Sequence, residues 1–191
     1  MAHTSTYDVK FRRRLRGKTN YAKRLALVKS GLPRLVVRKS NKYVYAQLIE
    51  FKSEGDKVLA SVNSRELEKF GWNASKKNVP AGYLTGLLVG LTAKKAKIGK
   101  AVLDIGMKRP VHGSVQFSLL KGAVDAGLEM NFDESAVPPK ERIEGKHIGD
   151  FASKLSSEDF NKIFSDYAKK KVDAKNLPKV FETVKNKILS Q

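Results

Sequence analysis

The sequence contains no cysteine among its 191 residues. This absence excludes disulfides, thiolate catalysis, iron–sulfur ligation and cysteine-based zinc sites, and it fits a reducing cytosol. Long apolar runs are also missing, since the longest, Ala81 to Ala93, has 13 residues and a bilayer span needs ~20. The segment Met1 to Asp8 has no apolar run, so it is not a secretory signal. We therefore expect a soluble protein that does not enter a membrane.

Acidic residues are scarce, and they are scarcest near the N-terminus. The chain has 38 Lys and Arg against 19 Asp and Glu, which gives a formal net charge of +19. Residues 1–44 hold 13 of the cations and a single acid, Asp8, so the remaining 147 residues carry only +7. Such a surface attracts polyanions, which include nucleic acid, anionic membranes and acidic proteins. With 41% hydrophobic residues, the rest of the chain can form an ordinary core.

The order of predicted elements indicates the α/β class, with a small mixed sheet that contains a β meander and has its crossover helices on one face. An extended segment is expected from the Pro138-Pro139 loop to Ile148, followed by a helical C-terminal tail. We divide the chain into a basic arm with a short helix (1–32), an α/β domain (33–150) and a helical extension (151–191). The predicted strands are 34–39, 42–49, 57–62 and 101–106, and the predicted helices before the tail are 21–31, 65–70, 78–97 and 114–129.

Helix starts are marked by capping residues. Thr19 or Asn20 can cap the first helix, Ser64 the second, and Asn78, with Pro80 in the first turn, the long third helix. In the tail, capping at Ser156-Ser157-Glu158-Asp159 precedes an apolar stripe, and Pro178 lies in the first turn of a last helix, 180–189. The stripe consists of Phe160, Ile163, Phe164 and Tyr167.

Three glycines, Gly82, Gly86 and Gly90, recur every four residues on the long helix. In a membrane this spacing marks helix dimers. In this chain we expect it to allow close packing of the helix against the sheet. No Walker sequence or strand–GxGxxG–helix unit accompanies the glycines, so a phosphate-binding loop is not indicated.

The Ser40-Asn41 pair between two strands predicts a two-residue hairpin turn. That turn would place Arg38 opposite Tyr43 and give the hairpin two faces. The apolar face would be Leu35, Val37, Val44, Ala46 and Leu48. The other face would be Arg34, Val36, Arg38, Tyr43, Tyr45 and Gln47, with cations and aromatic rings and no acid.

Two features of this basic region favour nucleic acid. The arginine cluster 12–16 presents planar guanidinium donors that match phosphate oxygens, although a solubilising tail or a nuclear-targeting patch would also be basic. Aromatic rings on the hairpin can stack on bases while neighbouring arginines neutralise phosphates. The alternative for that face is a second core layer or a protein interface, which Val36 and Ile49 favour.

The loop 108–113 offers a third basic site, because His112 and its neighbours precede a helix N-terminus, where an anion is favoured. A plain surface loop is the alternative. No two histidines have metal-ligand spacing, and no serine lies in a nucleophile elbow. Asp104 and Asp125 lack a catalytic partner, and we expect structural pairing with a lysine or a cap. The sequence therefore predicts no enzyme activity, no metal, no cofactor and no small-molecule substrate.

The segment 31–47 resembles the universal large-subunit ribosomal protein eighteen family, whose archaeal and eukaryotic members bind 5S ribosomal RNA. The resemblance covers about residues 9–150, and its motifs agree in order and spacing. Further motifs are Phe11-Arg12-Arg13-Arg14, Gly17-Lys18-Thr19, Tyr21 with Lys23-Arg24-Leu25, Leu59-Ala60-Ser61, and the segments 81–88, 102–106, 120–128, 141–143 and 145–148. The triple arginine and the long C-terminal part look archaeal or eukaryotic, and the short stretch before the triple arginine favours archaea.

This resemblance implies a structural role in the central protuberance of the large subunit of a cytoplasmic ribosome. The implied partners are 5S rRNA, large-subunit rRNA and a neighbouring 5S-binding protein, while the partners of residues 151–191 stay open. The implied RNA contacts coincide with those chosen by charge and geometry. They are Arg12, Arg13, Arg14, Arg16, Lys18, Lys23, Arg24, Arg34, Arg38, Lys39, Ser40, Asn41, Lys42, Tyr43, Lys108, Arg109 and His112.

We expect an architectural mechanism in which the arm orders between RNA helices. Arm and hairpin together could neutralise ~6–10 phosphates, which makes binding steeply salt-dependent. Two other hypotheses remain. A chromatin-like protein would bind duplex DNA as tightly as structured RNA. An RNA-processing enzyme such as a nuclease would need clustered acids, and loss of Asp104 and Asp125 would then abolish cleavage.

Overall fold

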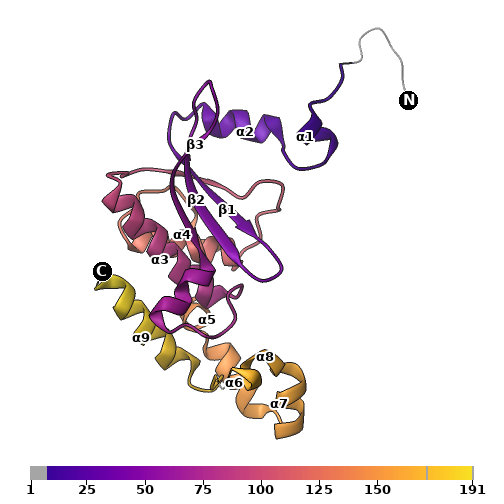
Figure 1. Cartoon of the computed structure of the whole chain (residues 1–191), viewed down its shortest axis with the longest axis vertical. Helices are drawn as coiled ribbons and strands as arrows, with labels where there is room; N and C mark the ends of the chain where they lie inside the picture. The colour runs from indigo at the N-terminus through magenta and orange to yellow at the C-terminus, as the bar shows by residue number, and fades with distance from the viewer. Residues whose placement is uncertain (1–7, 171, 191) are drawn as a thin grey trace.

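The computed structural model describes residues 8–170 and 172–190 and contains a four-stranded mixed sheet of order β3-β2-β1-β4. β1 pairs antiparallel with β2 and parallel with β4, and β2 pairs antiparallel with β3. The parallel pair requires a crossover, which η1 and α3 supply between β3 and β4 (Figure 1). The α/β class and the mixed sheet are therefore confirmed. The strands are β1 (Arg34–Lys39), β2 (Val44–Glu50), β3 (Lys57–Asn63) and β4 (Val102–Asp104).

One face of the sheet is covered by α3, and other helices extend beyond the sheet. α3 packs on β2 and β3, and α4 packs against α3. In Figure 1 the short helices α6, α7 and α8 form a lobe at one end of the molecule, while α1 and α2 project at the opposite end. None of the helices in the described ranges is long and apolar enough to cross a membrane. The helices are α1 (Arg12–Leu15), α2 (Tyr21–Val28), η1 (Ser64–Phe70), α3 (Val79–Lys95), α4 (Val115–Asp125), η2 (Glu134–Ala136), α5 (Lys140–Glu144), α6 (Lys146–Lys154), α7 (Ser157–Ile163), α8 (Ser165–Lys169) and α9 (Leu177–Leu189).

The hairpin closes with a four-residue turn, and the predicted two-residue turn is wrong. Lys39 lies opposite Val44, and Arg38 lies opposite Tyr45 instead of Tyr43. The Ser40 hydroxyl accepts a hydrogen bond from the Tyr43 N–H at 3.0 Å, and the Ser40 N–H donates to the Tyr43 carbonyl at 2.8 Å. The shift is two residues, so every side chain keeps its face. The predicted apolar face is buried, as expected: Leu35, Val37, Val44, Ala46 and Leu48.

Three of the predicted caps are present and one is wrong. Ser156 accepts a hydrogen bond from the Asp159 N–H at the start of α7. Asn20 accepts a hydrogen bond from the Lys23 N–H, and Asn78 accepts one from the Ala81 N–H. The cap of η1 is Asn63, not Ser64. The Ser64 hydroxyl is fully buried and instead accepts a hydrogen bond from the Val44 N–H at 2.9 Å. Ser64 therefore satisfies the first backbone N–H of β2, and Asn63 caps η1 in its place.

The three glycines on α3 allow close packing, but against α4 and not against the sheet. A Cβ at Gly86 would lie 2.0 Å from the Leu119 carbonyl oxygen, and one at Gly82 would lie 2.8 Å from Val115. Gly122 on α4 lies equally close to α3, because a Cβ at Gly122 would lie 2.2 Å from the Tyr83 carbonyl oxygen. The backbones of the two helices are therefore in direct contact.

The C-terminal part differs from the prediction in two places. The segment expected to be extended up to Ile148 forms α5 and the start of α6, joined at Gly145 with φ +84°. The predicted apolar stripe is divided between α7 and α8, because Phe164 leaves helical geometry at φ −101°, ψ 36°. α9 begins at Leu177 with Pro178 in its first turn, as predicted. Its apolar face joins the main core through Leu177, Phe181, Val184 and Ile188.

Candidate nucleic-acid interface

The N-terminal arm presents its arginines to solvent. α1 is a single turn without a buried residue, and Gly17 ends it with φ +59°. Two contacts hold α1 close to α2: Arg13 Nε donates to the Thr19 hydroxyl at 2.9 Å, and the rings of Phe11 and Tyr21 lie 5.0 Å apart. Since like charges crowd this segment, a counter-charge from outside the chain would stabilise it. The exposed cations of the arm are Lys10, Arg12, Arg13, Arg14, Arg16, Lys18, Lys23 and Lys29.

An alternating row of charges connects the arm to the sheet. Arg24 on α2 pairs with Asp56 at 2.9 Å, and Asp56 pairs with Arg34 at 2.8 Å. Arg34 continues to Asp104 at 3.0 Å, and Asp104 pairs with Arg38 at 3.1 Å. We call these five residues the arginine–aspartate row. It links α2, the β2–β3 turn, β1 and the end of β4, so it fixes the arm relative to the strands.

The hairpin residues of this face include no acid, but the fold brings two acids to it from other elements. Asp104 reaches it because β4 lies beside β1, with Asp104 opposite Val36, and Asp56 reaches it from the turn before β3. Arg34 is only 4% exposed and has both terminal nitrogens on carboxylates. Its Nε is buried without a hydrogen-bond partner among the described residues. Arg34 therefore positions its neighbours from beneath the surface. Val36 is buried, as expected if part of this face forms a second core layer.

Arg38 connects the sheet to the basic loop that follows β4. Its guanidinium donates to the Asp104 carbonyl oxygen at 2.7 Å and lies over Gly106, where a Cβ would be 2.9 Å from the Arg38 Cζ. Gly106 adopts φ +67° and donates its N–H to Asp104 Oδ1 at 2.8 Å. Roughly half of the Arg38 side chain remains exposed, so it can also face a ligand.

The loop after Gly106 carries the third predicted group. Lys108 and Arg109 are exposed, and His112 is exposed with its Nδ1 3.1 Å from the Ser135 carbonyl oxygen. A proton on Nδ1 is needed for this contact, which leaves Nε2 to face outward. The nearby Asp133 has its pKa lowered by hydrogen bonds from Ser135 and by the charge of His112.

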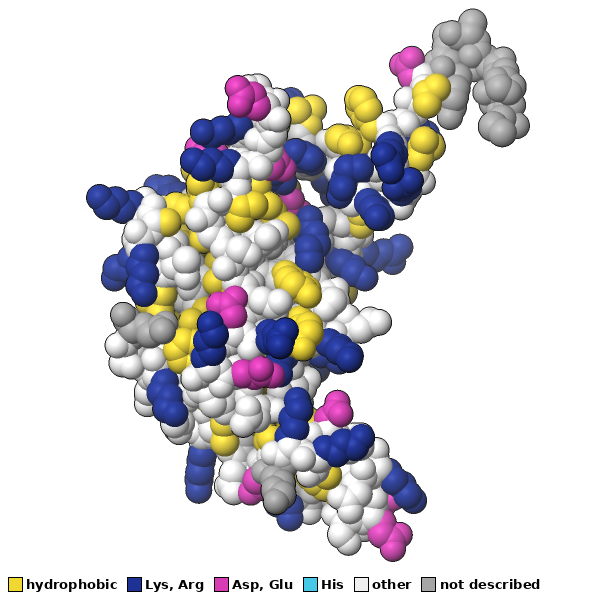
Figure 2. Space-filling view, in the orientation of Figure 1, with side chains coloured by type: hydrophobic (Ala, Val, Ile, Leu, Met, Phe, Trp, Pro, Cys, Tyr) yellow, Lys and Arg dark blue, Asp and Glu magenta, His cyan; other side chains and the backbone are white. Residues whose placement is uncertain are grey.

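These groups line or flank one groove of about 560 Å³ between the arm and the sheet. The arm contributes Arg13, Lys18 and Lys23, and the sheet side contributes Arg38 together with Gly106 and Pro110. Figure 2 shows Lys and Arg side chains gathered around the arm and along the adjoining side of the molecule. The arrangement can hold a chain of phosphates, because the exposed cations outnumber the paired carboxylates.

The hairpin turn lies apart from this groove. Lys39, Ser40, Asn41 and Lys42 are exposed there, while Tyr43 is half-buried and has the Lys76 ammonium 5.9 Å from its ring centre. The structure therefore separates the predicted residues into a groove and a hairpin tip. The lysines near Tyr43 in the 73–77 segment were not predicted as contacts, and the only sequence signal for them is the pair Lys76-Lys77 before a helix cap.

The two acids considered for catalysis have structural partners. Asp104 pairs with arginines, where a lysine or a cap was expected. Asp125 pairs with Lys121 at 3.2 Å and accepts a hydrogen bond from the Tyr83 hydroxyl at 2.8 Å. Within residues 8–170 and 172–190, no three His, Asp or Glu side chains are placed to hold a metal ion. Asp104 and Asp125 thus each have a structural partner.

Comparisons with known proteins agree with this picture. A family model described as ribosomal large subunit proteins 60S L5 and 50S L18 matches residues 5–99. The chain is also 48% identical over 189 residues to the large ribosomal subunit protein uL18 of Korarchaeum cryptofilum (strain OPF8). That alignment covers 98% of this chain and 97% of the relative. It therefore includes the C-terminal extension, which lies beyond the family-model match.

Proposed function

Because the chain belongs to the uL18 family of large ribosomal subunit proteins, we propose that it carries 5S rRNA and attaches it to the central protuberance. Family membership makes it a structural constituent of the large subunit of the cytoplasmic ribosome, where its partners are rRNA and ribosomal proteins. Such a role requires no catalysis. The finer partners in the proposal are 5S rRNA, large-subunit rRNA and a neighbouring 5S-binding protein.

The basic groove between the arm and the sheet is the observation that carries the proposal. Cations converge there from α1, the segment that joins α1 to α2, α2 and β1. The arginine–aspartate row holds these elements together without cancelling the exposed charges. α2 then needs little further ordering when RNA arrives, which preserves binding free energy.

Recognition would depend on RNA shape more than on base edges. The major groove of an A-form helix is too deep and narrow for side chains, so proteins contact phosphates, 2′-hydroxyls and unpaired bases. A single-turn helix with exposed arginines can lie along a phosphate backbone. The hairpin tip, with Lys39, Lys42 and Tyr43, would contact a second RNA surface.

A competition gel shift tests the proposal. The purified chain is mixed with labelled archaeal 5S rRNA at physiological salt, with excess unrelated structured RNA in one series and duplex DNA in another. A 5S carrier keeps its complex against both competitors. Equal displacement by duplex DNA would instead identify a chromatin-like polyanion binder. RNA that is shortened during incubation, with cleavage lost in an Asp104→Asn variant, would identify a nuclease.

A further inference from the structure

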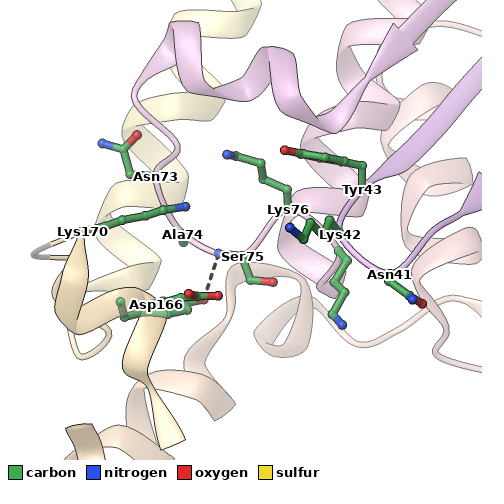
Figure 3. A pocket seen from close by; sticks show the side chains of 11 residues that line it. Asn41, Lys42, Tyr43, Asn73, Ala74, Ser75, Lys76, Asp166 and Lys170 are labelled. Carbon is green, nitrogen blue, oxygen red and sulfur yellow. Dashed lines mark hydrogen bonds between the residues drawn. The ribbon is translucent and has the colours of Figure 1, made fainter. Parts of the chain in front are cut away.

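A second basic cavity lies at the hairpin tip, where three distant parts of the chain meet. Its volume is about 330 Å³. The β1–β2 turn supplies Lys42 and Tyr43, the 73–77 segment supplies Lys76, and the end of α8 supplies Lys170. Figure 3 shows Lys76 beside the Tyr43 ring and Lys170 reaching from α8 toward the 73–75 segment. The cavity thus needs the C-terminal extension as one of its walls.

The floor of this cavity is held by two aromatic side chains. Trp72, which is fully buried, donates its Nε1–H to the Ser75 carbonyl oxygen at 3.1 Å. The Ser75 N–H donates to the Tyr167 hydroxyl at 3.1 Å, which ties the segment to α8. Burial raises the pKa of Tyr167, so this hydroxyl stays neutral across the physiological range. The backbone of the 73–77 segment is therefore fixed before any ligand binds.

Positive charge in the cavity exceeds negative charge. Lys42, Lys76, Lys77 and Lys170 line it, and Asp166 is the acid among the lining residues. Lys76 is only 8% exposed and pairs with Glu68 outside the cavity. Burial, together with the charges of Lys170 and Arg65, lowers the pKa of Lys76. An anion in the cavity would offset this repulsion, because it would lie beside both Lys76 and Lys170.

We propose that this cavity binds one unpaired nucleotide of ribosomal RNA, with its base stacked on Tyr43 and its phosphate between Lys76 and Lys170. The proposal rests on the proposed function and extends it to residues of the C-terminal extension. A stacking ring beside cations is the arrangement with which proteins bind single-stranded nucleic acid. The polar groups of Asn41, Asn73 and Ser75 can meet the edges of a base or ribose.

An acidic peptide is the competing ligand, and the composition of the cavity favours RNA over it. A carboxylate would pair with the lysines and would not stack on the Tyr43 ring. The cavity also continues the exposed cations of the hairpin tip, Lys39 and Lys42, so one RNA strand could contact both. A paired nucleotide cannot enter, because its base is held within a duplex.

The test compares RNA binding by the full chain and four single variants. Lys170→Glu removes the cation from α8, and its matched control is Lys169→Glu, an exposed lysine one residue away that does not line the cavity. Tyr43→Leu removes the ring, and Tyr43→Phe retains it. The probes are a fluorescent single-stranded RNA decamer of mixed sequence and a duplex RNA of the same length. Circular dichroism confirms that each variant is folded.

We expect Tyr43→Leu and Lys170→Glu to weaken binding of the single-stranded decamer by about fivefold or more, and Tyr43→Phe and Lys169→Glu to have little effect. Lys170→Glu should also lower the salt slope by about 1. Duplex binding should not distinguish Lys170→Glu from Lys169→Glu. Equal effects of these two variants on the single-stranded decamer would overturn the proposal.

Two further readouts separate the remaining outcomes. A glutamate decapeptide that displaces the RNA decamer, and whose binding falls in Lys170→Glu but not in Tyr43→Leu, would replace the nucleotide with an acidic protein partner. The gel shift with 5S rRNA is run in parallel on the unmodified chain. If the 5S complex is specific while Lys170→Glu matches Lys169→Glu, only the cavity proposal fails. If both competitors displace 5S rRNA, the gel shift contradicts the proposed function whatever the cavity variants show.

Discussion

Arg34 and Asp104, 70 positions apart in the sequence, form a buried ion pair of 3.0 Å directly beneath the basic face of the sheet. Arg34 is 4% exposed and Asp104 is 7% exposed. The pair lies at the centre of the arginine–aspartate row, so it connects the arm on one side with the basic loop on the other. The surface that is proposed to bind RNA is thus stabilised by a buried ion pair whose residues do not contact RNA.

Removal of Asp104 should destabilise the fold. In Asp104→Ala, Arg34 loses one of its two carboxylates and Arg38 loses its only one, and breaking a buried pair costs about 3 kcal/mol or more. Urea unfolding followed by Trp72 fluorescence measures the change in the free energy of unfolding. Asp56→Ala is the comparison. Asp56 is partly exposed, so its loss should lower the free energy of unfolding by less. An equal loss in both variants would contradict the central position of Asp104.

Removal of the arm arginines should weaken RNA binding and flatten its salt dependence. Arg12, Arg13, Arg14 and Arg16 are exposed and unpaired with acids among the described residues. Substituting all four with Gln should lower the slope of log K against log salt by up to about 4. The matched control changes Lys154, Lys162, Lys179 and Lys187 to Gln, which removes the same charge elsewhere. If the control flattens the slope equally, net charge and not the arm governs binding.

A methyl group at Gly86 should not fit between α3 and α4. Its Cβ would lie 2.0 Å from the Leu119 carbonyl oxygen, so the two helix backbones must separate. Overpacking of this kind costs roughly 1–3 kcal/mol, and contact with backbone places Gly86→Ala at the upper end. Gly99→Ala has open space around its Cβ and should change stability little. Thermal unfolding of both variants checks the difference, and a Gly86→Ala protein as stable as Gly99→Ala would disprove the close approach.

These elements also show what the sequence could and could not predict. The hairpin faces were correct although the register was not, because side chains alternate with period two and the error was two residues. Glycine spacing predicted a close approach, but small residues do not identify the element that approaches. The acids of the basic face were missed because Asp56 and Asp104 reach it only through pairing with distant strands.

The C-terminal part of the fold was harder to predict, because its structure also depends on contacts between distant segments. The proline pair before Lys140 suggested an extended segment, yet Pro139 serves as the residue before a helix of good helix formers. The groove residues could be chosen from charge, since exposed cations need no tertiary information. The cavity at the hairpin tip could not, because Tyr43, Lys76 and Lys170 come together only when α8 packs against the 73–77 segment.

Acidification should reduce stability through His147. Burial and the charge of Arg142 lower the pKa of His147 below its ordinary 6.5, so the folded protein binds this proton less readily than the unfolded chain. Stability is unaffected above about pH 6.5 and falls as the pH drops below it, since the unfolded state then binds more protons. Urea unfolding at pH 7 and pH 5 should show a smaller drop for His147→Gln. An unchanged drop would mean that other groups cause it.

Retention of 5S rRNA by large subunits that lack this chain can be measured directly. Large subunits are reconstituted from their rRNA and proteins with the chain omitted, added back, or added as the four-arginine arm variant. We expect subunits with little 5S rRNA when the chain is absent, full recovery with the unmodified chain, and partial recovery with the arm variant. Full 5S occupancy in its absence would contradict the proposal that this protein attaches 5S rRNA to the subunit.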